Sequence, residues 1–132
     1  MKLYIKITYI FICMTFFQAN SQTTDTLTYV KSFETNKIQY IGHPLTKLLN
    51  DMIQLQPKSV WSTSIYYSHF NFCKVDNSTD IGTVNMVIYW QLPIPESESE
   101  YYSNKNQFYF TNDEKNFYGS KTVKDIYVYT TK

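Results

Sequence analysis

The fold is decided by a stretch near the middle of the chain, Thr83-Val84-Asn85-Met86-Val87-Ile88-Tyr89-Trp90-Gln91-Leu92. Apolar and polar side chains alternate along it, and Val87 is the one exception. Alternation with a period of two is typical of a strand that buries one face. We therefore predict a strand over residues 81–92 whose apolar stripe meets a hydrophobic core. The stripe consists of Val84, Met86, Ile88, Trp90 and Leu92.

A helix with a matching stripe is predicted at residues 44–55. Its apolar residues recur at the i, i+3, i+4, i+7 and i+8 positions of one helical face; they are Leu45, Leu48, Leu49, Met52 and Ile53. Pro44 suits the first helical position, where an N–H would have no partner, and Pro57 ends the helix. Such a stripe requires a cover, and we expect the stripe of strand 81–92 to supply it.

The other segments predict a small antiparallel sheet. Residues 59–74 are rich in aromatic and β-branched residues, and we expect a long strand that forms a hairpin with strand 81–92. Further strands are predicted at 27–33, 107–111 and 124–130, turns at 76–80 and 112–120, and a solvated, mobile loop near 93–106. No strand–helix–strand alternation calls for a parallel sheet. The predicted fold class is α+β, with an antiparallel sheet of three to five strands and one main helix packed across one face.

Residues 1–21 are predicted to be a secretory signal that is cleaved. Lys2 and Lys6 accompany an apolar run at 7–17, and the small residues Ala19 and Ser21 precede the expected cut. The run is about half of the roughly 20 residues needed to span a bilayer. We therefore expect a single domain at residues 22–132, without a transmembrane span, in the periplasm or outside the cell.

Lipidation is the alternative route of export. Cys13 lies inside the apolar run, but the bulky Phe11 and Ile12 precede it where a lipidated cysteine would need small residues. The sequence therefore favours cleavage after Ser21.

Charge and cysteine content restrict the possible functions of the mature chain. Without the leader it has ten Lys and no Arg against eleven acidic residues, so its formal charge is −1. A near-neutral chain lacks the positive charge that phosphate contacts require, and we expect no nucleic-acid partner. Cys73 is the one cysteine left, so no internal disulfide can form and the domain depends on packing.

The sequence contains no motif for catalysis, a metal or a cofactor. His43 and His69 lack the spacing of paired metal ligands. His69 and Cys73 are four residues apart on one predicted strand, which places them about 13 Å apart at ~3.3 Å per residue, too far for proton transfer. Asp76 and Asp80 lie in a polar turn that lacks the calcium-loop pattern. We therefore predict no catalytic residue, no metal ligand and no cofactor.

Aromatic content is the most unusual feature of the sequence. The chain holds 13 Tyr, 9 Phe and 2 Trp, and many of them fall in predicted strands. Tyrosine favours strands in any case, but rings on the sheet face away from the helix could bind a protein or a glycan of the cell envelope. The candidate binding residues are Tyr66, Phe70, Phe72, Tyr89, Tyr127 and Tyr129.

The cut site Ala19-Asn20-Ser21-Gln22 and the stretch that opens the helix, Tyr40-Ile41-Gly42-His43-Pro44-Leu45-Thr46-Lys47-Leu48-Leu49, resemble small uncharacterised exported proteins of Bacteroidota type. That group has no assigned activity, so the resemblance implies export and no functional residue. The function we favour is a non-enzymatic binding or interaction module of accessory, inhibitor or immunity type. The alternatives are a small hydrolase-like enzyme with an unrecognised site and a carrier of a small apolar ligand.

Overall fold

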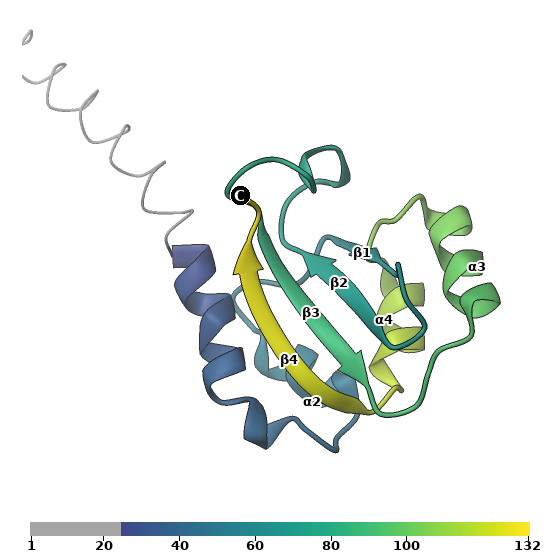
Figure 1. The fold of residues 1–132 in the computed structure, drawn as a ribbon, viewed down its shortest axis with the longest axis horizontal. Helices are drawn as coiled ribbons and strands as arrows, with labels where there is room; N and C mark the ends of the chain where they lie inside the picture. Colours follow the sequence, from purple (N-terminus) through teal and green to yellow (C-terminus); the bar gives the residue numbers. More distant parts are fainter. Residues whose placement is uncertain (1–24) are drawn as a thin grey trace, which may run out of the picture.

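The computed structural model describes residues 25–132, and the predicted leader therefore lies outside the described residues (Figure 1). Four strands form one antiparallel sheet in the order β1-β2-β3-β4, so each strand pairs with its neighbours in sequence. They are β1 (Ser59–Trp61), β2 (Tyr67–Asn71), β3 (Val84–Trp90) and β4 (Val123–Thr130). The α+β class with an antiparallel sheet is confirmed.

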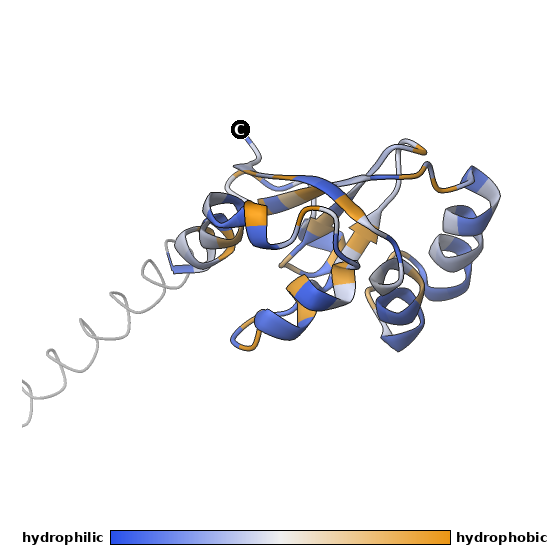
Figure 2. Cartoon of the chain, turned by 90° about the horizontal axis from the view of Figure 1, so that it is seen from below, coloured by the Kyte–Doolittle hydropathy of each residue, from blue (hydrophilic) through white to orange (hydrophobic). Residues whose placement is uncertain are grey.

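The helices lie on one side of this sheet. They are a helix at residues 25–35, α2 (Leu45–Asp51), α3 (Glu96–Asn106) and α4 (Asn112–Gly119), joined by the short 3₁₀ turns η1 (Lys37–Gln39) and η2 (Val75–Asn77). Figure 2 shows the helices beneath the strands, and no helix above them. Within residues 25–132 no helix combines the length and apolarity that a membrane crossing requires.

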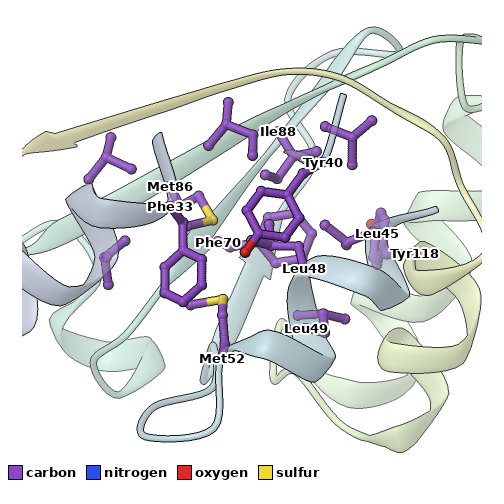
Figure 3. Close-up of a cluster of buried hydrophobic side chains, with 14 of the residues drawn as sticks. Phe33, Tyr40, Leu45, Leu48, Leu49, Met52, Phe70, Met86, Ile88 and Tyr118 are labelled. Carbon is purple, nitrogen blue, oxygen red and sulfur yellow. The ribbon is translucent and has the colours of Figure 1, made fainter. Parts of the chain in front are cut away.

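The core lies between α2 and the sheet, as the two stripes predict. Leu45, Leu48 and Leu49 of α2 share one buried cluster with the stripe of β3 (Figure 3). Phe33, Phe70, Ile126 and Val128 belong to the same cluster. Both predicted stripes extend too far along the chain, because α2 ends at Asp51 and β3 ends at Trp90. Ile53 and Leu92 fall beyond these ends and are 86% and 77% exposed.

A small polar network is buried within this core. Trp90 Nε1 donates to Ser68 Oγ at 3.0 Å, and Ser68 Oγ lies 2.6 Å from Ser62 Oγ. Tyr118 from α4 stacks on Trp90 and reaches Ser62 through its hydroxyl at 3.4 Å. Every polar group in this network has a partner, which removes most of the cost of burying it. The network also links α4 to β2 and β3.

The predicted strand at 27–33 is wrong, because these residues belong to the helix at 25–35. Leu27, Tyr29 and Phe33 fit the alternation of a strand, but Leu27, Val30 and Phe33 fit helical spacing, and Val30 and Phe33 are buried in the core. The helix covers the outer edge of β4. Lys31 Nζ donates to the Val128 carbonyl at 3.0 Å, and the Val128 N–H donates to Glu34 at 3.3 Å. The helix therefore occupies an edge that would otherwise be open to strand pairing.

The predicted loop at 93–106 is wrong over most of its length, because Glu96–Asn106 form helix α3. Only Ser99 of this helix is buried, so no apolar stripe marks it in the sequence. Pro95 precedes its first turn, where Glu96 and Glu98 favour the positive end of the helix dipole.

The predicted turn at 112–120 holds helix α4 instead. Thr111 and Glu114 form a capping box: the Thr111 side chain accepts from the Asp113 N–H, and Glu114 accepts from the Thr111 N–H at 2.9 Å. The sequence pattern Thr-x-x-Glu signals such a start.

Residues 59–74 form two short strands rather than one long strand. β1 and β2 pair with each other across residues 62–66, and β2 then pairs with β3 as the predicted hairpin requires. The predicted strand at 107–111 is reduced to one bridge between Tyr109 and Ser59. The Val60 N–H donates to the Phe108 carbonyl at 3.0 Å, so this segment covers the edge of β1. The final strand at 124–130 is confirmed as β4.

We predict that Ile88→Asp unfolds the domain, whereas Leu92→Asp does not. Ile88 is fully buried opposite α2, and a carboxylate there would have no partner, at a cost of more than about 4 kcal/mol. Leu92→Asp is the matched control, because it introduces the same carboxylate at an exposed position of the predicted stripe. Thermal unfolding followed by circular dichroism distinguishes the two variants, and equal melting temperatures would refute the assignment of the core.

Candidate functional site

One face of the sheet is closed by helices, and we call the opposite face the open face. Successive side chains of a strand alternate between the two faces, and the strand register aligns the open-face residues in rows. One row holds Tyr67, Tyr89 and Asp125, the next His69, Val87 and Tyr127, and the third Asn71, Asn85 and Tyr129; Trp61 lies beside His69 on β1.

Aromatic rings cover much of the open face. Tyr67 contacts both Tyr89 and His69, with ring centroids 5.4 and 5.5 Å apart, and Tyr127 stacks on Tyr129 at 5.8 Å. Val87, at the centre, is only 4% exposed although no helix among the described residues covers it. The rings and strand neighbours around Val87 therefore shield it, while Tyr127 remains half exposed.

A groove of about 320 Å³ opens toward the Asn71–Asn85–Tyr129 end of this face. Its lining combines rings, amides and hydroxyls, and it includes Trp61, His69, Asn71, Asn85, Tyr129 and Thr131. Each of the strands β1 to β4 supplies at least one lining residue. The paired strands give this part of the groove a fixed backbone frame, which favours a preformed binding site, and the loop residues Thr63, Ser78 and Thr79 complete the lining.

Two asparagine side chains form the polar part of the groove. Asn71 Nδ2 donates to Asn85 Oδ1. Asn85 Nδ2 in turn donates to the Thr83 carbonyl and to Thr131 Oγ1, and these last two hydrogen bonds are both 3.0 Å long. Both amides are more than nine-tenths buried. The described part of the chain offers no hydrogen-bond donor to Asn71 Oδ1, and it occupies only one N–H of Asn71 Nδ2. Asn71 therefore retains an acceptor and a donor that a ligand can use.

The ionisable groups in the groove favour their neutral forms. Burial lowers the pKa of His69 and raises the pKa of Tyr129, to which Tyr127 and Tyr67 also contribute. The Tyr129 hydroxyl lies 3.4 Å from His69 Nδ1. At neutral pH this contact joins a neutral imidazole to a neutral phenol.

Asp125, the one acid of the three rows, lies at the far end of the open face. Lys37 Nζ contacts Asp125 Oδ1 at 2.7 Å, and this hydrogen bond lowers the pKa of Asp125. Among residues 25–132, no Lys, Arg, Asp or Glu lines the groove.

Trp61 forms one wall of the groove. Its ring stacks on Phe108, with centroids 3.9 Å apart and 11° between the planes. Trp61 Nε1 is buried and has no hydrogen-bond partner among residues 25–132. An unpaired buried donor is uncommon and costs about 1–3 kcal/mol.

Three of the six predicted binding residues lie on the open face: Tyr89, Tyr127 and Tyr129. The placement of Phe70 and Phe72 on an exposed aromatic face is corrected, because both are buried in the core cluster on the closed face. Phe70 packs edge-on against Trp90, Phe110 and Tyr118. Tyr66 is exposed but precedes β2 and belongs to none of the three rows.

The prediction missed the open-face residues of β1 and β2, namely Trp61, Tyr67, His69 and Asn71, and also Asn85 of β3. The alternation of side chains along β2 indicates which of its residues lie on the open face. Once Phe70 is assigned to the core with Met86, its register partner, the residues at 67, 69 and 71 must face the other way.

His43, His69 and Cys73 lie in different surroundings. His43 is exposed before α2, His69 lines the groove, and Cys73 lines a separate hollow with Phe72. Within residues 25–132, no three His, Cys, Asp or Glu side chains are grouped closely enough to hold a metal ion.

Comparison with known proteins returned no relative. No family model matches the chain, and neither the curated proteins nor the solved structures contain a significant match. The geometry of the open face is therefore the basis for a functional assignment.

We predict that His69 titrates below its ordinary pKa of 6.5, because burial disfavours the imidazolium. The unfolded chain then binds a proton more readily than the folded chain, so stability falls as the pH drops from about 6.5 toward the folded-state pKa. An NMR titration of the imidazole carbons measures this value. A His69 pKa at or above 6.5 would contradict the burial of the ring.

Proposed function

We propose that this chain is an exported, non-enzymatic binding module that holds its partner on the open face of the sheet. The observation that carries the proposal is a sheet face that no helix of residues 25–132 covers, on which three neighbouring strands present aromatic rings beside a groove. Aromatic side chains contribute a large share of the energy of binding surfaces, because they bury much area at little entropic cost.

The shielding of Val87 supports the same function. Rings that contact one another around a buried residue are held in fixed positions, so less conformational entropy is lost when a partner binds. The exposed rings of Tyr89 and Tyr127 then offer prearranged contact area.

The carrier alternative requires space between helix and sheet. That layer is filled by packed side chains, among them Leu48, Met52 and Ile88, each with no measurable exposed surface. The groove of about 320 Å³ lies instead on the open face, where a partner can reach it directly. The structure therefore favours binding on the surface of the sheet.

The exported location belongs to the proposal and rests on the leader at residues 1–21. A binding module outside the cytoplasm would meet components of the cell envelope first, which makes isolated envelope the appropriate material for a test.

We predict that the mature domain binds saturably to washed envelope from the cells that produce it. Tyr127→Ala and Tyr89→Ala should each weaken this binding roughly tenfold, the effect typical of a tyrosine in the centre of an interface. Co-sedimentation over a range of protein concentrations measures the affinity.

Tyr101→Ala is the matched control. Tyr101 is 58% exposed, comparable with Tyr127 at 50%, but it lies on α3 and not on the open face. Binding that is not saturable, or that Tyr101→Ala weakens as much as Tyr127→Ala does, would refute the open face as the binding surface.

A further inference from the structure

The groove of the open face has a chemistry that restricts its ligand. Its described lining residues carry no charge at neutral pH, since burial lowers the pKa of His69 and no Lys, Arg, Asp or Glu among residues 25–132 lines it. An ionic ligand would lose its hydration there without gaining a counter-charge, which is costly. The groove is therefore suited to a neutral ligand.

The polar groups of the groove call for a ligand rich in hydroxyls. Asn71 is 2% exposed, yet its Oδ1 atom accepts from no described donor and one of its N–H groups is unused. A carboxamide presents its acceptor and its donor side by side, so it can bind two adjacent hydroxyl groups at once. Within residues 25–132, the one hydrogen-bond contact of Tyr129 Oη is a long one of 3.4 Å to His69, which it can exchange for a shorter one to a ligand.

The same groove also offers apolar surface. Rings of Trp61, His69 and Tyr129 line it, and Phe108 holds the Trp61 ring from behind. A pyranose ring combines adjacent hydroxyl groups at its rim with C–H groups on its faces, which pack against aromatic rings. The mixture of unused amide groups and aromatic walls matches both parts of such a ring.

We propose that this groove binds one or two sugar rings of a neutral glycan, with Asn71 hydrogen-bonded to adjacent hydroxyl groups. The inference rests on the proposed function and specifies the ligand of its binding surface. The volume of about 320 Å³ lies at the lower end of the range of ligand pockets, ~300–1,000 Å³, so a short unit fits and the rest of a chain extends along the open face.

The test is an NMR titration of the mature domain with soluble probes. The neutral probes are gluco-, manno-, galacto- and N-acetylglucosamine oligosaccharides, and the charged probes are oligogalacturonate and sialyllactose. We expect at least one neutral probe to bind, with shifts centred on the side-chain amides of Asn71 and Asn85, and no binding of the charged probes.

Substitutions in the groove locate the ligand. Asn71→Ala should weaken binding of the neutral probe about tenfold, because two hydrogen bonds are lost, and Tyr129→Phe about three- to tenfold. Tyr129→Phe removes only a hydroxyl group and preserves the ring, so it provides the answer if Asn71→Ala does not fold. Tyr101→Phe on α3 removes a hydroxyl group away from the open face and should leave the affinity unchanged.

Three results would overturn the sugar assignment: no neutral probe binding at about 10 mM, tighter binding of a charged probe, or full affinity in both groove variants. The envelope assay separates this failure from that of the proposed function. If Tyr127→Ala still weakens envelope binding while no neutral sugar binds, the open face is a binding surface for another class of partner. If Tyr127→Ala has no effect on envelope binding, the proposed function itself is wrong.

Discussion

The packing of the α2 leucines against the apolar stripe of β3 determines the rest of this structure. Leu45, Leu48 and Leu49 belong to the same buried cluster as Val84, Met86, Ile88 and Trp90, and this shared core fixes which face of β3 is buried. Since neighbouring strands are held in register, the choice made at β3 applies to β2 and β4 as well. Tyr89 and Tyr127 of the open face are exposed because the helices of residues 25–132 occupy the opposite face.

The hydrogen-bonding needs of the sheet edges explain two further features. The 25–35 helix supplies Lys31 and Glu34 to the backbone of β4, and the segment at 108–110 pairs with the backbone around β1. Both edges are thus occupied, which protects the sheet from pairing with other strands. The uncovered surface that remains is a side-chain face of the sheet, so it exposes side chains and not unpaired backbone groups.

The sequence predicts an element well where a periodic row of apolar side chains marks its buried face, and poorly where no such row exists. The stripes of α2 and β3 were readable because each buries a long row of apolar side chains against the other. Helix α3 has no such row, because only Ser99 is buried, and its charged residues resemble those of a loop. The segment at 27–33 fits two periodicities, a strand through Leu27, Tyr29 and Phe33 and a helix through Leu27, Val30 and Phe33, and tertiary packing selects the helix. Of the predicted binding residues, Tyr89, Tyr127 and Tyr129 lie on the open face, whereas the assignment of Phe70 to the core requires the register of β2 against β3.

The central claim is that the sheet has one closed face and one open aromatic face, and photochemically induced nuclear polarisation tests it most directly. A photoexcited flavin polarises only those Tyr, Trp and His side chains that it can touch in the folded protein. The structure predicts strong signals from Tyr89 and Tyr127 and none from Tyr118 or Trp90, which are buried against Phe70. Strong polarisation of Tyr118 or Trp90, with Tyr89 and Tyr127 silent, would show that the faces are assigned the wrong way round.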